Sequence, residues 1–322
     1  MPRPGPGEVV LRVTRALTCA TDAKMLRQGQ HPALPPPPAP FGHEAAGVVS
    51  AIGPGVADVH EGDAVVVANS APCGACPPCV AGRPSLCEAI VYLTGAFAEY
   101  LLVPARIVER NMLPLPAGVA PERAAMVEPL ACAVRGVERV TAGPGDEVVV
   151  LGGGVQGTLI TALLAARGCL VTICDPHEER RARAVRFGAA RVMDAPRDPD
   201  AIAAVRAAHG AGRGPDAVVE AVGRPGAWEA AVAIARPGGE VLVYGGCAPG
   251  TTVTLPTFPL HYQELTIRGS YHHTPEAVRA ALGHLAAGDA PYDALIGDEV
   301  TLDEVPGILR AGSGEKRPVR MD

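Results

Sequence analysis

Residues 148–157 read Val148-Val149-Val150-Leu151-Gly152-Gly153-Gly154-Val155-Gln156-Gly157. The first four residues are apolar and mostly β-branched, which is typical of a strand inside a parallel sheet. A helical pattern opens directly behind the glycines and continues to Ala166. A strand, the spacing G-x-G-x-x-G and a helix, in that order, form the fingerprint of a dinucleotide-binding unit. This stretch therefore predicts a fold built on βαβ units and a site for a phosphate-rich cofactor.

Each position of the glycine turn has its own physical reason. Gly152 permits the tight turn, Gly154 lets the backbone approach a pyrophosphate, and Gly157 lets the helix pack close to the strand. Val155 and Gln156 lie between these glycines, and the helix that opens behind them at Thr158 offers unpaired N–H groups and a positive dipole end to phosphate. We assign all five residues to the cofactor site.

An acidic residue at the end of the next strand indicates which cofactor binds. Residues 170–174 form the expected second strand, and Asp175 follows it, 18 positions past Gly157. A carboxylate there accepts hydrogen bonds from the adenosine ribose and repels a 2′-phosphate, which predicts NAD rather than NADP. Arg180 lies on the following helix and is assigned to the cofactor site, although it also fits the exposed face of that helix. An ordinary strand end beside a glycine turn is the alternative interpretation.

Strands and helices alternate through the second half of the chain. Beyond Cys174 we expect helices at 177–187, 200–208, 227–235 and 275–287, and strands at 191–193, 216–220, 240–244 and 265–269. Such alternation with short turns produces a parallel, doubly wound sheet. The first half is β-rich, with strands expected at 8–14, 48–52, 64–67 and 97–104, an extended connector at Pro35–Pro38 and a helix at 122–127.

Composition and charge exclude several classes of protein. The chain has 322 residues, 48% hydrophobic and 19% charged, which is typical of a globular protein with about two domains. Its net charge of −6 comes without a basic stripe, so neither nucleic acid nor an anionic membrane is expected as a partner. No apolar run approaches 18 residues, and residues 1–6 lack the apolar core of a signal peptide. We therefore expect a cytoplasmic protein without membrane spans.

Four cysteines are crowded into one short stretch. Cys73, Cys76 and Cys79 follow the spacing C-x-x-C-x-x-C, and Cys87 comes seven residues later. Four thiolates match a closed tetrahedral zinc site, which leaves no position for a substrate. Such a metal would be structural and would stabilise a lobe, residues 69–88, that is too small for a core of its own. An iron–sulfur cluster or plain thiols are the alternatives.

A second group of metal-binding residue types lies upstream. Cys19 occurs in Cys19-x-Thr21-Asp22, and an adjacent histidine and carboxylate occur in Gly42-His43-Glu44-x-x-Gly47-x-x-x-x-x-Gly53-x-x-Val56. These are ordinary zinc ligands, although a single cysteine and histidine are more often packed core residues. The glycine-rich pattern resembles the zinc signature of the medium-chain, zinc-dependent alcohol and polyol dehydrogenases. The cysteine lobe, Glu128-Pro129 and the cofactor fingerprint follow in the order of that family, so the resemblance covers essentially the whole chain.

The resemblance implies a role for each residue of this group. Cys19 and His43 match two ligands of the catalytic zinc that the family shares. Glu44 matches a carboxylate that is a ligand in the sorbitol-dehydrogenase-like branch, and Glu128 stands where ethanol-type enzymes carry a second cysteine. One of the two glutamates is expected to bind zinc directly and the other to lie within reach of the zinc-bound water. We expect Glu44 to be the resting ligand and Glu128 to hold the water, with the reverse assignment as the alternative. Thr21 matches the hydroxyl that passes the alcohol proton towards solvent, and a satisfied turn residue is its alternative.

The chain also departs from the family pattern. Lys24 stands where many relatives carry the outer histidine of the proton relay. Relatives usually have a β-hairpin before the equivalent of residues 6–8. We therefore expect a different exit route for the proton, and first strands that are absent or replaced.

The resemblance implies an α/β protein of two domains. We expect a GroES-like, β-rich catalytic domain from residues 1–115 and 256–322, and a Rossmann NAD-binding domain from residues 116–255. The implied reaction is the zinc- and NAD-dependent oxidation of a secondary alcohol of polyol, cyclitol or sugar-like type to a ketone. Two zinc ions per subunit, one catalytic and one structural, and a homodimer or homotetramer are expected. A zinc-free quinone-type reductase and a non-catalytic cofactor-binding relative are the alternatives, and the intact metal ligands argue against the first.

Overall fold

The computed structural model describes residues 1–29, 39–312 and 315–321, which pack as two units. Unit 1 comprises Met1–Cys132 and His273–Asp322, and unit 2 is the intervening segment Ala133–His272. The sequence placed the two divisions after residues 115 and 255, whereas these units divide after residues 132 and 272. The tetraproline connector, residues 35–38, lies outside the described residues.

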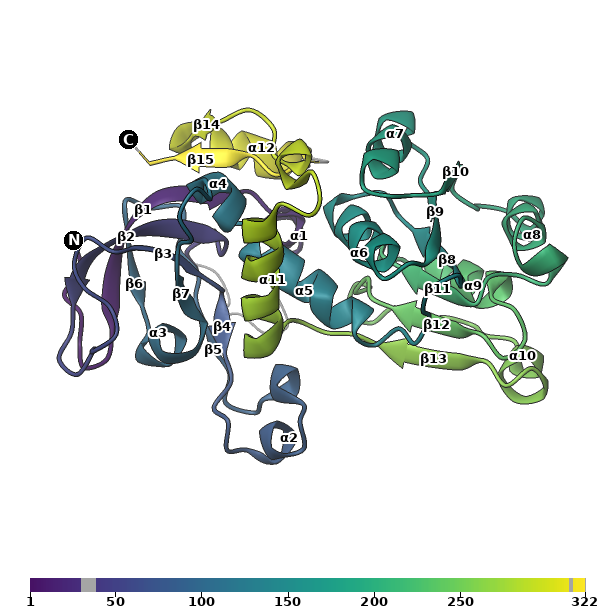
Figure 1. Ribbon diagram of the computed structural model, residues 1–322, viewed down its shortest axis with the longest axis horizontal. Helices are drawn as coiled ribbons and strands as arrows, with labels where there is room; N and C mark the ends of the chain where they lie inside the picture. Colours follow the sequence, from purple (N-terminus) through teal and green to yellow (C-terminus); the bar gives the residue numbers. More distant parts are fainter. Residues whose placement is uncertain (30–38, 313–314, 322) are drawn as a thin grey trace. The chain divides into compact units, whose positions relative to one another are not determined.

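Unit 2 contains the predicted parallel, doubly wound sheet (Figure 1). Its strands run in the order β10-β9-β8-β11-β12-β13, and every pairing is parallel. The order reverses between β8 and β11, and open sheets of this kind bind cofactors beyond the carboxyl ends of their strands at such a reversal. The strands are β8 (Glu147–Leu151), β9 (Leu170–Cys174), β10 (Arg191–Met193), β11 (Ala217–Glu220), β12 (Glu240–Val243) and β13 (Thr266–Gly269).

The helices of unit 2 begin where local chemistry favours a helix start. At the start of α8, the Asp198 side chain accepts a hydrogen bond of 2.8 Å from the Ala201 N–H, and Pro199 occupies the first helical position. This capping satisfies one of the N–H groups that a helix leaves unpaired. The helices and short 3₁₀ turn are α6 (Val155–Ala166), α7 (Glu178–Arg186), α8 (Pro199–Ala207), η2 (Gly210–Gly212), α9 (Pro225–Ile234) and α10 (Thr257–Tyr262).

Unit 1 is built on a seven-stranded sheet in the described residues, with strand order β14-β15-β1-β2-β3-β7 and β6 also paired with β1. Its core consists mainly of buried valine, alanine and leucine from these strands. Gly47 permits the close approach of β2 to β1, because a Cβ there would lie 2.5 Å from the Arg12 carbonyl oxygen. The strands are β1 (Val9–Leu17), β2 (Ala45–Ile52), β3 (Ala64–Val67), β6 (Tyr100–Val103), β7 (Met112–Pro114), β14 (Val300–Thr301) and β15 (Pro318–Arg320), and β4 (Ser70–Ala71) pairs separately with β5 (Val91–Tyr92).

Several helices surround this sheet, and one expectation about them was wrong. The single helix expected at 122–127 is two helices, α4 (Pro121–Ala124) and α5 (Val127–Val137). Pro129 does not end α5, because it lies in the first turn, where the missing N–H has no partner in the helix. The other elements of unit 1 are α1 (Ala20–Gln28), α2 (Pro77–Val80), η1 (Pro84–Leu86), α3 (Ala105–Asn111), α11 (Pro275–Ala287), η3 (Tyr292–Leu295), η4 (Leu302–Glu304) and α12 (Val305–Ala311).

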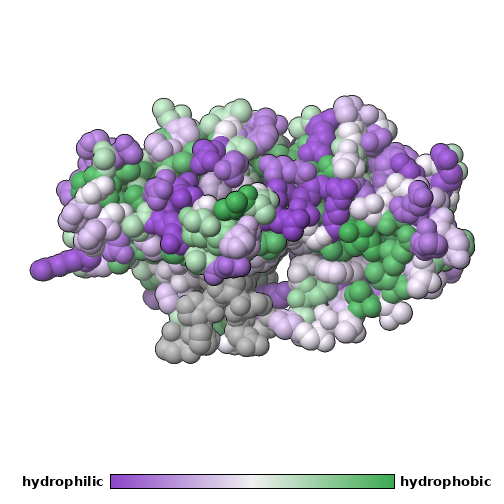
Figure 2. Space-filling model, turned by 90° about the horizontal axis from the view of Figure 1, so that it is seen from below, coloured by the Kyte–Doolittle hydropathy of each residue, from purple (hydrophilic) through white to green (hydrophobic). Residues whose placement is uncertain are grey.

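The coloured atoms on the face drawn in Figure 2 mix hydrophilic and hydrophobic residues. Within the described residues, none of the helices has the length and apolar character needed to cross a bilayer. In unit 2, the short helix α10 exposes the large apolar side chains of Phe258, Leu260 and Tyr262. Among the residues that the structure describes, the edge strand β13 of the same unit pairs with β12 alone. An open strand edge with exposed apolar residues is a surface suited to pairing with another chain.

Candidate functional site

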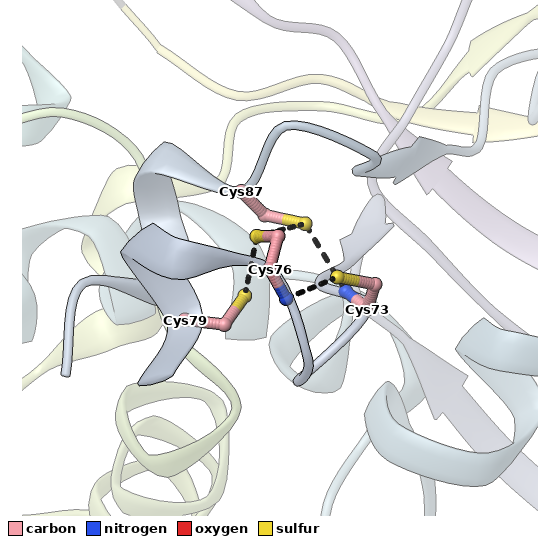
Figure 3. Close-up of side chains that lie close together, drawn as sticks. All are labelled: Cys73, Cys76, Cys79 and Cys87. Carbon is pink, nitrogen blue, oxygen red and sulfur yellow. Dashed lines mark hydrogen bonds between the residues drawn. The ribbon is translucent and has the colours of Figure 1, made fainter. Parts of the chain in front are cut away.

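The four-cysteine lobe has the geometry of a metal site (Figure 3). The sulfur atoms of Cys73, Cys76, Cys79 and Cys87 all lie within 4.8 Å of one another. The Cys76 sulfur is 3.4 Å from that of Cys79 and 3.8 Å from that of Cys87. A tetrahedron with zinc–sulfur bonds of about 2.3 Å has edges of about 3.8 Å. The spacing of the four sulfur atoms is therefore close to that of a zinc site.

Backbone N–H groups prepare these sulfurs to bind as thiolates. The N–H groups of Ala75 and Cys76 donate to the Cys73 sulfur at 3.4 and 3.3 Å, and they lower the pKa of Cys73 to about 6. The Cys73 N–H in turn donates to the Cys87 sulfur at 3.1 Å. The thiolate is the form of cysteine that binds metal. The turns between the cysteines thus supply the hydrogen bonds that a metal–thiolate site needs.

A second cluster forms in unit 1, where β1 ends and β2 begins. These two strands are antiparallel neighbours, and the Leu17 N–H donates to the Glu44 carbonyl oxygen at 3.0 Å. Cys19 follows β1 and caps α1, while His43 and Glu44 precede β2. The ligand atoms of Cys19, His43 and Glu44 lie within 4.8 Å of one another. The fold thus brings together the three residues that the resemblance identified as zinc ligands.

Asp22 orients the histidine of this cluster. Its Oδ1 lies 3.1 Å from the Nδ1 of His43 and also accepts a hydrogen bond of 3.3 Å from the Gly42 N–H. Both side chains are buried. A carboxylate on Nδ1 leaves Nε2 as the nitrogen available to a metal, which is the usual arrangement around zinc-binding histidines. Gly42 is required next to it, because its φ is +87° and a Cβ would lie 2.8 Å from the Phe97 nitrogen.

Lys316 is a cation inside the same cluster. Its ammonium donates to the Oε1 of Glu44, and both side chains are buried. The other carboxylate oxygen of Glu44, Oε2, is buried and has no hydrogen-bond partner among the described residues. Burial alone raises the pKa of the Cys19 thiol, but the charges of Lys316 and His43 outweigh it and bring the pKa to about 6. A thiolate, an available imidazole nitrogen and an unpartnered carboxylate oxygen are a donor set that fits zinc.

Glu128 lies beside this group rather than in it. It is buried in the first turn of α5, its Oε1 lies 3.6 Å from the Cys132 sulfur, and its carboxylate lies within 4.8 Å of a ring nitrogen of His273. Burial raises the pKa of Glu128, and the charge of His43 opposes that effect. Thr21 lies in the first turn of α1, where its N–H donates to the Cys19 sulfur at 3.5 Å. All the residues expected around the catalytic zinc are thus in one region of unit 1.

The glycine turn of unit 2 has the geometry of a phosphate-binding loop. Gly152 has a φ of +102°, and a Cβ on Gly157 would lie 1.8 Å from the Gly152 carbonyl oxygen. Gly154 is the N-cap of α6 and has no side chain to cap the helix, and a Cβ added there would meet no atom within 4 Å. Val155 opens the helix, and Gln156 accepts a hydrogen bond of 2.6 Å from the Tyr244 hydroxyl. The N-terminal N–H groups of α6 are therefore available to a pyrophosphate.

Asp175 is tied to this loop. Its Oδ2 accepts a hydrogen bond of 2.7 Å from the Gly153 N–H, and its Oδ1 accepts one of 2.9 Å from the His177 N–H. Arg180 is half-buried, and its Nη1 lies 3.8 Å from the Asp175 carboxylate. A carboxylate has about four acceptor positions, so two backbone hydrogen bonds leave capacity for ribose hydroxyls. The residues of the loop fit the adenosine half of a dinucleotide.

Sequence reasoning missed the roles of two residues in the metal cluster. Asp22 stood in the quoted pattern next to Thr21, and its position three residues after Cys19 was the available signal. Lys316 lies 272 positions from Glu44, and no local pattern marks it. Only the return of the C-terminal segment to β1, through the β15–β1 pairing, brings it to the cluster.

Comparisons with known proteins agree with this geometry. Residues 5–117 match the alcohol dehydrogenase GroES-like domain, and residues 156–287 match the zinc-binding dehydrogenase family. L-galactonate-5-dehydrogenase of Escherichia coli is 33% identical over 89% of this chain and 82% of its own length. L-threonine 3-dehydrogenase of Pyrococcus furiosus is 35% identical over 76% of this chain and 70% of its own. The crystal structure of a zinc-binding dehydrogenase from Sinorhizobium meliloti, bound to NADP, superimposes with a TM-score of 0.89 at 31% identity over 99% of this chain and 93% of its own.

Proposed function

The chain belongs to the medium-chain, zinc-dependent alcohol and polyol dehydrogenases, and we propose that it oxidises a secondary alcohol of polyol, cyclitol or sugar-like type to a ketone with NAD. One observation carries the proposal. Cys19, His43 and Glu44 offer three zinc donors within 4.8 Å of one another, and one oxygen of Glu44 is buried without a partner. This set supports a zinc enzyme over the zinc-free reductase that the fold also allows.

The protein's own residues prepare the reaction in four ways. When bound, zinc and NAD supply a Lewis acid that lowers the pKa of a hydroxyl group and an acceptor for hydride. Cys19, His43 and Glu44 hold the metal, and Asp22 keeps the imidazole in the tautomer that binds it. Thr21 relays the hydroxyl proton from beside Cys19 towards solvent. Glu128 accepts a hydrogen bond from the hydroxyl group and so orients it.

Glu128, the second carboxylate of the site, favours a polar substrate. Glu128 is an oxygen donor that tolerates water and hydroxyl groups in a site where a cysteine would be softer. The relatives named for L-galactonate and L-threonine support an alcohol with further polar groups.

The direct test is a panel of polyols, cyclitols, sugar acids and simple alcohols with NAD, in which the absorbance of NADH is followed. Oxidation of secondary alcohols by zinc-loaded protein is expected. Reduction of quinones by protein free of catalytic zinc, with no alcohol oxidised, would support the reductase instead.

Cofactor choice is proposed to depend on Asp175. Asp175→Ser removes a charged acceptor of ribose hydrogen bonds and the repulsion of a 2′-phosphate, so the ratio of kcat/KM for NAD over NADP should fall about 5- to 30-fold, equivalent to about 1–2 kcal/mol. Asp175→Asn keeps the shape and should change the ratio in the same direction. Asp194→Ser, an exposed aspartate after β10, is the matched control and should leave the ratio unchanged. A wild type that prefers NADP would contradict the assignment.

The quaternary structure and compartment are also part of this proposal. We propose a homodimer or homotetramer, supported by the open edge of β13 and the exposed Phe258 and Tyr262 of α10. Light scattering that measures a single-chain mass would contradict it.

The cytoplasm is the proposed compartment, because nine cysteines without a disulfide are typical of a reducing environment. Retention of the protein with the cytoplasmic fraction of cells checks this assignment.

A further inference from the structure

Lys316 is an unusual residue in this chain. Lys24 and Lys316 are the two lysines among 28 basic residues, the rest being arginine. Lys316 is also 3% exposed, although lysine is rarely buried unless it is paired. A compact ammonium on a flexible stem fits a confined space that a planar guanidinium does not. The position therefore calls for an explanation beyond surface charge.

The backbone at Lys316 is fixed on both sides. Its N–H donates to the Leu295 carbonyl oxygen at 3.0 Å, and its carbonyl oxygen accepts from the Gly297 N–H at 2.8 Å. The next residue, Arg317, donates its N–H to the Thr18 hydroxyl at 3.0 Å, directly before the ligand Cys19. Figure 1 shows β15, which begins two residues after Lys316, beside β1 in unit 1. The ammonium is therefore delivered to the metal cluster by a rigid segment.

The surroundings of the ammonium are strongly negative. It binds Oε1 of Glu44, and the charges of Cys19, Glu44 and Glu128 raise the pKa of Lys316 in spite of its burial. Glu44 is 0% exposed, so its charge has no solvent to stabilise it. An isolated buried carboxylate is costly, and removal of its partner leaves that cost uncompensated. Two cations meet this need, Lys316 permanently and zinc when it is bound.

We propose that Lys316 is a positioning residue of the catalytic metal site, acting as a built-in counter-cation for Glu44. It holds Oε1, the oxygen that lies 3.8 Å from the Nε2 of His43, so that the carboxylate keeps its place beside the other ligands before the metal arrives. This inference rests on the proposed function, in which Glu44 is a metal ligand. Hydrogen bonds to a ligating carboxylate are a general way of orienting it. The consequence is that the cluster stays formed without the catalytic zinc.

The test compares stability with and without the catalytic metal. Full-length protein is treated with a chelator until one zinc per chain remains, by metal analysis, and its melting temperature is measured before and after zinc is restored. Lys316→Met should lower the melting temperature of the zinc-depleted form by about 10 °C, because the buried Glu44 loses its partner. In the zinc-loaded form the drop should be less than half as large, since zinc compensates the carboxylate. Lys316→Arg should recover part of the loss.

Two further variants separate charge compensation from packing. Glu44→Gln/Lys316→Met removes both charges, so its zinc-depleted form should melt within about 3 °C of the wild type. Arg317→Met, which removes the neighbouring half-exposed cation that contacts Asp298, should shift both forms equally. The proposal holds if zinc restores most of the melting temperature of Lys316→Met, and if the double variant melts close to the wild type even when it is depleted of zinc. Equal drops in both forms, or a double variant as unstable as Lys316→Met, would overturn it. A wild type that never binds a second zinc would instead refute the proposed function.

Discussion

Glu44→Gln is expected to empty the catalytic zinc site, whereas Glu128→Gln is expected to keep the zinc and lose turnover. The Glu44 carboxylate lies within 4.8 Å of the ligand atoms of Cys19 and His43, while Glu128 contacts Cys132 and lies close to His273. Loss of a direct ligand should weaken zinc binding at least about 100-fold, and loss of an orienting carboxylate should lower kcat about 10- to 100-fold. Zinc content per chain and kcat of the zinc-loaded proteins measure the two effects.

The pairing of Glu44 with Lys316 requires a control for this experiment. Glu44→Gln leaves a buried ammonium without its partner, and the resulting instability could imitate the loss of a ligand. Glu44→Gln/Lys316→Met removes that complication and should still lack the catalytic zinc. If Glu128→Gln empties the site while Glu44→Gln leaves it full, the two roles are reversed. If neither change affects zinc content or rate, the catalytic-zinc assignment is wrong.

Cys87→Ser is expected to remove the structural zinc and to unfold the lobe around residues 73–87. Cys87 is buried, and its sulfur accepts N–H donors from both Cys73 and Ala89. A structural zinc contributes about 10 kcal/mol to the folding of a small unit, which is comparable to the net stability of a whole domain. The lobe has no buried hydrophobic residue in α2, so it has little to replace the metal. Metal analysis should find one zinc ion less per chain than in the wild type, and protease should cleave rapidly within residues 73–87.

The matched control for this prediction is a cysteine elsewhere in the chain. Cys169 in unit 2 is also buried, and its thiol donates to the Gly143 carbonyl oxygen at 3.3 Å. Cys169→Ser keeps a donor in that position and should retain both zinc ions and the protease resistance of the lobe. A Cys87→Ser protein with two zinc ions and an intact lobe would show that the four thiols do not form a metal site.

The expectations that succeeded depended on residues close together in the chain. The parallel, doubly wound sheet of unit 2 was predicted from alternating strands and helices, because parallel strands joined by short crossovers have few possible arrangements. The single helix expected at 122–127 was wrong, because the structure has two helices there and places Pro129 in the first turn of the second, α5. Proline occurs both in the first turn of a helix and at the end of one, and only the packing of the following turns distinguishes the two places.

By itself, the sequence determined the glycine turn, the four-cysteine lobe and the identity of Cys19, His43 and Glu44 as metal-binding types. In each case the chemistry is set by residue type and by spacing over a few positions, which covalent geometry converts directly into proximity. The tertiary structure alone decided that Asp22 orients His43 and that Lys316 neutralises Glu44. The second contact joins residues 272 positions apart. It exists because burial of the shared sheet of unit 1 brings the C-terminal strand β15 back against β1, and no local pattern encodes that pairing.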